Sequence, residues 1–444
     1  MRHCFALLIV LSLLLPASAA EPKKTREQLV REDRVKVEAT GYWIYQDLAK
    51  GYAEAQQTGK PILVILRCLP CVECVKLDDE LMDNDPELRP LLDQFVRVRV
   101  VGTNGLDLSL FQFDTDQSFT AFLLNADGTI YGRFGTRSHQ TEWVGDVSLA
   151  GMSRALEGAL ELHKDYPSNK ASLSGKRGPQ PEFGSPEVMP GLREKYTSTL
   201  NYEGNVVQSC IHCHQIGDAQ RDHIRAQRKP MPEAVLFPHP HPKAIGLVLD
   251  PTERASVVEV AEGSWAAQSG FQAGDRIETL AGQPLLSMAD VQWVLHHADA
   301  AGATIPAQVL RGDKTVRLEL KLPAGWRRQD NIAWRASSWG LRRMATGGFF
   351  SQELSAEARK ANGLSATGMA LQIEHVGQYA PHDAAQRAGL LKGDIVVEFD
   401  GRTDLLRESD LLAYGVTQHF PGDQIKVKIQ RAGKPLELTL TIQE

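Results

Sequence analysis

The chain has 444 residues, of which 42% are apolar and 23% are charged. This composition is typical of folded globular proteins and excludes a wholly disordered or collagen-like chain. The formal net charge of −6 gives no broad basic surface, so the composition does not favour a nucleic-acid-binding protein. At roughly 150 residues per domain the length predicts two to four domains. Six cysteines are too few for a scaffold held together by disulfides.

The first twenty residues have the layout of a secretory signal peptide. Arg2 precedes an apolar run over residues 5–15, and small residues follow at 16–20. The run is too short to cross a membrane, and an uncleaved anchor is the alternative. We therefore predict a signal peptide over residues 1–20 and an exported protein, periplasmic or secreted, without a transmembrane span in the mature chain. The polar, highly charged residues 21–40 are expected to form an exposed lead-in.

A domain over residues 40–165 follows. It begins with a predicted helix over residues 44–58 and a strand over residues 62–66, whose continuously apolar sequence is typical of a strand buried on both faces. The other expected elements are a helix, three strands and a final helix, over residues 75–82, 95–101, 120–124, 129–134 and 147–163. This order, with Gly-Lys-Pro at residues 59–61 before the first buried strand, resembles a thioredoxin fold.

Three cysteines, Cys68, Cys71 and Cys74, follow the buried strand. Thiol exchange requires a thiolate near ambient pH and a second thiol within reach. Cys71 is expected at the N-terminus of the next helix, where the helix dipole stabilises an anion, and Cys74 lies one turn later. We therefore predict Cys71 as the attacking thiol and Cys74 as the resolving thiol of a thiol–disulfide oxidoreductase, with Cys68 as an accessory thiol.

A static disulfide or a structural metal site in an exchange-inactive thioredoxin fold is the alternative for this cluster. Glu73 lies inside the motif, and its negative charge opposes thiolate formation. Phe119 stands where thioredoxin-like enzymes carry a cis-proline that faces the cysteines. Because a cis peptide is costly outside proline, the substrate-binding backbone is expected to be altered.

Residues 166–236 are predicted to be a linker, because proline and glycine are frequent near both ends. Within it, Cys210-Ile211-His212-Cys213-His214 matches the signature of c-type haem attachment. Cys210 and Cys213 would bind haem c covalently, and His214 would bind its iron from one side. The candidates for the distal iron ligand are Met231, His223, His239 and His241. Zinc bound by Cys210, Cys213, His214 and His223, or a disulfide between the two cysteines, is the alternative.

The C-terminal half contains an internal repeat. The sequence of residues 270–277 recurs at residues 389–395, with the shared pattern Gly-apolar-x-x-Gly-Asp. This pattern resembles PDZ domains of the bacterial type. The resemblance predicts a first PDZ domain over residues 237–328 and a second over residues 329–444.

PDZ domains bind extended peptides by strand addition and capture a terminal carboxylate in a nest of backbone amides. We expect this nest at Ile245-Gly246-Leu247 in the first domain and at Trp339-Gly340-Leu341 in the second. Domains that serve for packing only are the alternative. Trp326, Trp334 and Trp339 lie among arginines between the repeats, which favours cation–π stacking at a domain junction over a partner-binding patch.

The combination of signal peptide, thioredoxin-like domain, Cys-x-x-Cys-His segment and two PDZ domains resembles a bacterial family of thioredoxin-like/PDZ fusion proteins, some of which carry selenocysteine. The expected fold class is therefore multidomain, α/β plus mainly β. The resemblance implies redox chemistry at the first cysteine cluster. We expect an exported thiol–disulfide and electron-transfer protein whose PDZ domains recruit protein or peptide C-termini and whose haem acts as a relay. A non-catalytic periplasmic adaptor with structural cysteines is the alternative.

Overall fold

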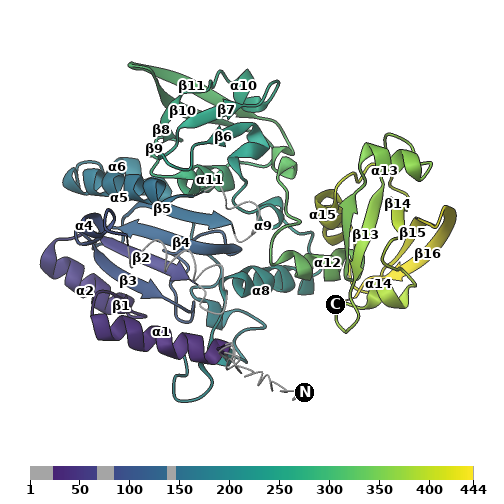
Figure 1. Cartoon of the computed structure of the whole chain (residues 1–444), viewed down its shortest axis with the longest axis horizontal. Coiled ribbons are helices and arrows are strands. Elements are labelled where there is room, and N and C mark those ends of the chain that lie inside the picture. Colours follow the sequence, from purple (N-terminus) through teal and green to yellow (C-terminus); the bar gives the residue numbers. More distant parts are fainter. Residues whose placement is uncertain (1–23, 68–84, 138–146, 444) are drawn as a thin grey trace, which may run out of the picture.

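The computed structural model describes residues 24–67, 85–137 and 147–443, which form an N-terminal domain, a middle segment and two repeat domains (Figure 1). The expected signal peptide lies outside these residues. Within them, no helix combines the length and the hydropathy needed to cross a membrane.

The N-terminal domain is built on a five-stranded sheet of order β1-β3-β2-β4-β5. The central strand β2 pairs in parallel with β3 and antiparallel with β4. All six of its residues are buried, as expected for a continuously apolar strand. The strands are β1 (Ile44–Tyr45), β2 (Ile62–Arg67), β3 (Val96–Val100), β4 (Gln117–Leu124) and β5 (Ile130–Arg137).

Helices cover both faces of this sheet. Leu63 and Ile65 of β2 belong to the apolar cluster that includes Met152 of α5, while Val64 belongs to the cluster that includes Ala55 of α2. The helices are α1 (Arg26–Thr40), α2 (Leu48–Thr58), α4 (Arg89–Leu92) and α5 (Leu149–Lys164). The expected helix over residues 44–58 is therefore shorter, because its first residues form β1.

The expected exposed lead-in is instead helix α1. Thr25 and Gln28 form a capping box at its start, and Val30 and Val37 are buried. Arg31 also donates a hydrogen bond to the carbonyl of Tyr202 at 2.7 Å. These contacts reach a part of the chain far away in sequence, which the local composition does not reveal.

The middle segment is packed rather than an extended linker. Lys176 is fully buried and forms an ion pair with Asp290 at 2.9 Å. Pro186 occupies the first turn of a short 3-10 helix, a position that does not need an N–H group. The helical pieces are α6 (Lys170–Leu173), η1 (Ser174–Lys176), η2 (Pro186–Val188), α7 (Val206–Ser209), α8 (Cys213–Ala226) and α9 (Glu233–Leu236).

The first repeat domain encloses one apolar core within a four-stranded sheet, β11-β10-β8-β9, and a two-stranded sheet, β6-β7. Its strands are β6 (Leu247–Leu249), β7 (Val257–Val260), β8 (Arg276–Leu280), β9 (Gln283–Pro284), β10 (Ala303–Arg311) and β11 (Lys314–Leu322). Its helices are η3 (Pro242–Ile245), α10 (Trp265–Gln268), α11 (Met288–His297) and η4 (Trp326–Gln329).

The second repeat domain has its own apolar core and a five-stranded sheet of order β12-β13-β14-β15-β16. Its strands are β12 (Phe349–Glu353), β13 (Leu371–Val376), β14 (Ile395–Phe399), β15 (Gln424–Arg431) and β16 (Lys434–Thr441). Its helices are α12 (Ser338–Thr346), α13 (Ala356–Ala361), α14 (Ala384–Arg387) and α15 (Glu408–Gln418).

The repeated Gly-Asp pair has the same structural role in both domains. Asp275 accepts a hydrogen bond from the backbone N–H of Gln272 and forms an ion pair with Arg311 at 2.7 Å. Asp394 does the same with Leu391 and Arg431. The repeat therefore identifies a turn that closes the fold rather than a binding site.

The first repeat domain docks on the N-terminal domain through the start of α11. Ser287 Oγ donates to the carbonyl of Arg133 in β5 at 2.6 Å, and Asp290 accepts from the backbone N–H of the same residue at 3.2 Å. The guanidinium of Arg133 lies 3.6 Å from the ring centre of Trp293. These buried polar contacts fix the orientation of the two domains.

Candidate functional site

The predicted thiol pair, Cys71 and Cys74, and the accessory Cys68 lie outside the described residues. The structure does describe the strand that leads to them. Arg67 ends β2, and it lies opposite Phe119 of β4 in the sheet register. Phe119 is fully buried, so a large aromatic side chain, rather than proline, packs beside the end of the strand that leads to the cysteines.

Two buried arginines lie at the same end of the sheet. Arg67 forms an ion pair with Asp33 of α1, and burial followed by the charge of Arg99 lowers its pKa. Arg99, in β3, packs over the ring of Trp43. Positive charge near a thiol favours the thiolate.

The Cys210–His214 segment lies on the N-terminal domain, at the end of β3. The backbone N–H and the hydroxyl of Thr103 both donate to the carbonyl of Ile211, at 3.1 and 2.8 Å. Asn104 Oδ1 accepts from the N–H of Ile211 at 2.9 Å. Cys213 then begins α8, and Gln215 caps this helix by accepting from the N–H of His212.

The two thiols of this segment differ in exposure, since Cys210 is buried and Cys213 is half-buried. Cys210 is buried, with its Sγ 3.7 Å from the carbonyl oxygen of Val101. A small void of about 10 Å³ beside Cys213 is also lined by Leu66 and Arg67, so this cysteine lies near the end of β2. Burial raises the pKa of Cys210 and of Cys213 to about 12 each. Both thiols are therefore protonated and poorly nucleophilic at neutral pH.

The described residues leave little free space for a haem beside these thiols. The void at the thiols is about 10 Å³, whereas pockets for ligands of that size measure about 300–1,000 Å³. The ring of His214 lies parallel to that of His212, with centres 6.0 Å apart, and its Nδ1 is 3.5 Å from Asp218. Met231 is buried in a separate apolar cluster, and His239 and His241 are buried near the first repeat domain.

The alternative zinc set is not brought together either. His223 lies nine residues after His214 in α8, about 14 Å further along the helix axis, and its Nε2 contacts Glu182 at 3.1 Å. Among the described residues, no three His, Cys, Asp or Glu side chains gather in a metal-binding arrangement. Cys210 and Cys213 are both free thiols in this structure. A disulfide between them stays an open alternative.

The first expected carboxylate nest forms a glycine turn before a strand. Gly246 has φ 88° and follows the 3-10 helix η3, and Leu247 begins β6. A Cβ at Gly246 would lie 2.2 Å from the side chain of Ser264, so only glycine fits. Ile245 and Leu247 are both buried in the core of this domain.

The second expected nest was placed wrongly. Trp339, Gly340 and Leu341 lie inside helix α12. The turn that leads into the corresponding strand β12 is Gly347-Gly348, with φ 69° and 97°. The spacing of the Gly-Asp repeat does not predict the position of the Gly347-Gly348 turn. In the second domain, helix α13 lies between this turn and the Gly-Asp pair, and the first domain has no matching helix.

The expected cation–π contacts occur at the domain junction. The guanidinium groups of Arg327, Arg335 and Arg342 lie 5.1, 4.9 and 4.8 Å from the ring centres of Trp326, Trp334 and Trp339, respectively.

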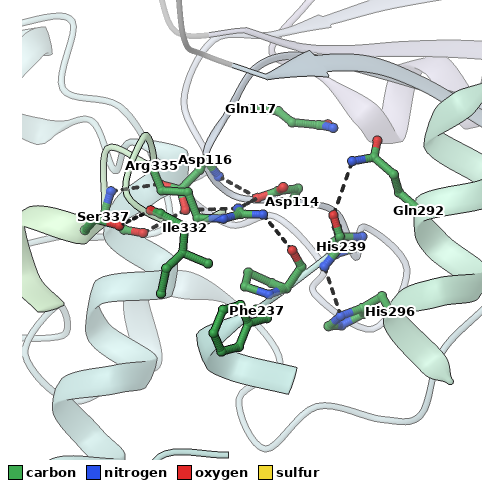
Figure 2. Close-up of polar contacts among 12 residues, drawn as sticks. Asp114, Asp116, Gln117, Phe237, His239, Gln292, His296, Ile332, Arg335 and Ser337 are labelled. Atoms are coloured by element: carbon green, nitrogen blue, oxygen red, sulfur yellow. Dashed lines mark hydrogen bonds and ion pairs between the residues drawn. The ribbon is translucent and has the colours of Figure 1, made fainter. Parts of the chain in front are cut away.

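The sequence analysis did not identify the role of Arg335 at this junction. Arg335 is fully buried and forms ion pairs with Asp114 and Asp116 of the N-terminal domain, as Figure 2 shows. Nearby, His239 lies between Gln292 and His296 (Figure 2). The run of tryptophans and arginines between the repeats indicated that Arg335 lies at a domain junction. No local sequence pattern indicated Asp114 or Asp116 as its partners.

Family models match both halves of the chain. A thioredoxin-like model matches residues 43–126, and a PDZ-domain model matches residues 243–322 and 369–442. No curated protein matches the chain.

Solved structures match parts of the chain at low similarity. The HtrA-type protease AlgW, in a variant form with a decapeptide, is 17% identical over 32% of this chain and 48% of its own, with a TM-score of 0.21. The HtrA3 PDZ domain with a phage-derived ligand is 19% identical over 21% of this chain and 80% of its own, with a TM-score of 0.17. This chain thus spans about half the length of the AlgW chain. On the two family models, the protein is a thioredoxin-like/PDZ fusion, with one thioredoxin-like domain followed by two PDZ domains.

Proposed function

We propose that this protein is an exported thiol–disulfide exchange protein that uses Cys71 and Cys74 and recruits its partners through its PDZ domains. The Cys71 thiolate attacks a disulfide of the partner and forms a mixed disulfide. Cys74 then attacks the Cys71 sulfur and releases the partner as a dithiol. The two electrons pass to the partner, and Cys71 and Cys74 end as a disulfide; the reverse sequence oxidises a partner dithiol.

The observation that carries this proposal is the position of β2. A fully buried central strand ends at Arg67, so the chain leaves the sheet at its carboxyl end directly before the cysteine cluster. Functional residues of α/β folds lie at this end of the strands. The buried cations Arg67 and Arg99 support thiolate formation there.

Cys210 and Cys213 are assigned a structural role in this proposal. Their burial and their raised pKa make them poor attacking groups, while their backbone is bonded to Thr103 and Asn104. They would hold α8 against the thioredoxin-like domain. No step of the exchange reaction passes through a haem.

The PDZ domains supply the recruitment step. Modules of this class bind partners by adding an extended peptide to a sheet edge, which would raise the local concentration of a partner disulfide. Export follows from the signal peptide expected over residues 1–20, and an oxidising compartment would supply partners with disulfides.

A redox titration tests the exchange reaction. The mature protein is equilibrated in glutathione buffers, and the oxidised fraction of Cys71 and Cys74 is read from the mass added by a maleimide reagent. We expect a midpoint between about −120 and −270 mV, the range of exchange-active proteins. The variants C71A and C74A should abolish the transition, while the matched control C210A/C213A should retain it.

A midpoint below about −300 mV, typical of structural disulfides, would overturn the proposal. The protein would then be better described as a periplasmic PDZ adaptor with structural cysteines. Retention of the transition in C71A would reassign the exchange to another thiol pair, such as Cys68 and Cys74.

A further inference from the structure

The free edge of strand β12 is engaged by the protein itself. β12 is an edge strand that pairs only with β13, so it is the strand to which a peptide would add in the second PDZ domain. The backbone N–H of Ser351 in β12, however, donates to Oε1 of Glu408 at 2.9 Å. Glu408 begins helix α15, so this side chain bridges the strand and the helix where a peptide would lie.

Glu408 is held in place by Arg342 of helix α12. Arg342 Nε and Nη2 donate to its two carboxylate oxygens at 3.1 and 2.6 Å. Arg342 Nη2 also donates to the carbonyl of Ala333 at 2.7 Å. Both charged side chains are at least 95% buried. The contact is therefore a desolvated bidentate pair, which is costly to break from one side.

Helix α12 also covers the apolar side of α15. Ile332, Leu341 and Met344 pack in one cluster with Leu412 and Val416. A Cβ at Gly415 would lie 2.6 Å from the Cβ of Ala345, so the two helices touch through their backbones. We call residues 331–346, which include α12, the second cap.

The first PDZ domain has a corresponding arrangement. Helix α11 occupies the place of α15, since Val291 and Leu411 fill the two domain cores. Gln292 Nε2 of α11 donates to the carbonyl of His239 at 3.2 Å, and the N–H of His239 donates to Nδ1 of His296 at 3.3 Å. The rings of His239 and His296 stack with centres 4.1 Å apart. We call residues 237–241, which lie just before the glycine turn of this domain, the first cap.

One buried side chain joins both caps to the thioredoxin-like domain. Arg335 belongs to the second cap, and its Nη2 donates to the carbonyl of Pro238 in the first cap at 2.6 Å. Its Nη1 lies 2.6 Å from Asp114 Oδ1 and 3.4 Å from Asp116 Oδ2 (Figure 2). Ser337 of the second cap adds two hydrogen bonds to Asp116, at 2.9 and 2.7 Å.

We infer that the chain's own caps close the peptide-binding sides of both PDZ domains in the resting protein, and that Arg335 is the latch that holds both caps on Asp114 and Asp116. A peptide partner then gains access only when the caps move. The inference deepens the recruitment step of the proposed function and rests on it. Asp114 and Asp116, which bind the latch, belong to the thioredoxin-like domain that also carries Cys71 and Cys74. The residues that control access of a partner are therefore part of the same domain as the thiols.

Amide hydrogen exchange of the full-length reduced protein tests the latch without a ligand. The variant R335M removes the guanidinium, and R335K keeps a charge but cannot bridge Pro238 and both aspartates. We expect exchange to rise at least about tenfold in both caps together, with no change in strands β10 and β15 of the PDZ cores. The matched control R431M removes an Arg–Asp pair of the second PDZ domain that touches neither cap, and it should leave the first cap unchanged.

A peptide-retention measurement tests the closure of the binding sides. The probe is a pool of decapeptides with free carboxylates and randomised last four positions, and the amidated pool is the control. We expect R335M and R335K to retain at least about ten times more free-carboxylate peptide than the wild type.

Three outcomes would overturn the inference. The first is that amide hydrogen exchange stays unchanged in either cap of both R335M and R335K. The second is that the wild type and the variants retain equal amounts of peptide, and the third is that none of them retains any peptide. None of these readouts involves Cys71 or Cys74, so a failure here is distinguishable from a failure of the redox titration.

Discussion

Lys176 and Asp290 form a fully buried ion pair, with Nζ 2.9 Å from Oδ1, that joins the middle segment to helix α11 of the first PDZ domain. The two residues come from parts of the chain that the sequence analysis assigned to a linker and to a separate domain. Asp290 also accepts hydrogen bonds from the backbone N–H groups of Arg133 and Leu286. This carboxylate therefore joins three parts of the chain.

Breaking this pair should destabilise the protein strongly. K176M leaves the buried Asp290 without its ammonium partner, and loss of one member of a buried pair costs about 3–5 kcal/mol. Urea unfolding followed by circular dichroism measures the change. The control R254M removes a more exposed pair with Glu161 and should cost at most about 1 kcal/mol. Equal losses in the two variants would show that the buried pair has no special weight.

The stacked histidines should make the stability of the domain junction depend on pH. Burial lowers the pKa of His239 and of His296 well below 6.5, and the nearby cations Arg335 and Arg327 lower both pKa values further. The unfolded chain therefore binds more protons than the folded protein below about pH 6.5, and stability is lost as the pH falls through this range.

Each histidine contributes a slope of up to about 1.4 kcal/mol per pH unit. Unfolding free energies measured between pH 8 and pH 5 should fall, and H239Q should reduce this slope. An unchanged slope in H239Q would contradict the prediction.

The thiols of Cys210 and Cys213 should react slowly in the folded protein. With pKa values of about 12, the thiolate fraction at pH 8 is only about 10⁻⁴. Alkylation by iodoacetamide, followed by peptide mass spectrometry, should be more than about a hundredfold slower than in the guanidinium-unfolded protein. Labelling of Cys213 in the native protein as fast as in the unfolded protein would contradict the prediction.

Expression in a host that matures c-type cytochromes should give a protein without covalent haem. The thiols lie against Val101 and the end of β2, and the adjacent void of about 10 Å³ cannot hold a macrocycle. Intact mass and the reduced-pyridine spectrum measure this directly. A covalent haem that is lost in C213A would contradict the structure and restore the electron-transfer interpretation.

The glycine turn before β12 should tolerate no side chain at Gly348. A Cβ there would lie 1.9 Å from the carbonyl oxygen of His382, whereas a Cβ at Gly422, which has a similar φ of 95°, would meet no atom within 4 Å. G422A should therefore cost about 1 kcal/mol, the backbone contribution alone. G348A should cost at least about 2 kcal/mol more. Thermal unfolding of the two variants separates the contributions, and equal costs would exclude the steric one.

Much of the domain organisation was readable from local sequence. The continuous apolar run of β2 predicted a strand buried on both faces, and the repeated Gly-Asp pairs at Asp275 and Asp394 predicted two related domains. These signals are local, because burial on both faces and tight turns each require particular residues within a few positions of one another. The family models agree with this part of the prediction.

The composition of the middle segment does not report its distant contacts. Pro186 begins a short 3-10 helix here, and the buried pair of Lys176 and Asp290 holds the segment on the first PDZ domain. Trp339-Gly340-Leu341 was predicted to form a carboxylate nest, whereas these residues lie in helix α12, where Leu341 packs against α15.

The sequence by itself therefore determined which modules the protein contains and where the repeated Gly-Asp turns lie, since strand burial and glycine turns depend on neighbouring residues. Only the tertiary structure decided how the modules are joined. Asp114 and Arg335 are separated by 221 positions, and the residues around each of them do not predict that the two side chains pair. Their burial makes the pairing obligatory, because a charge that leaves water must find its partner wherever the fold places it.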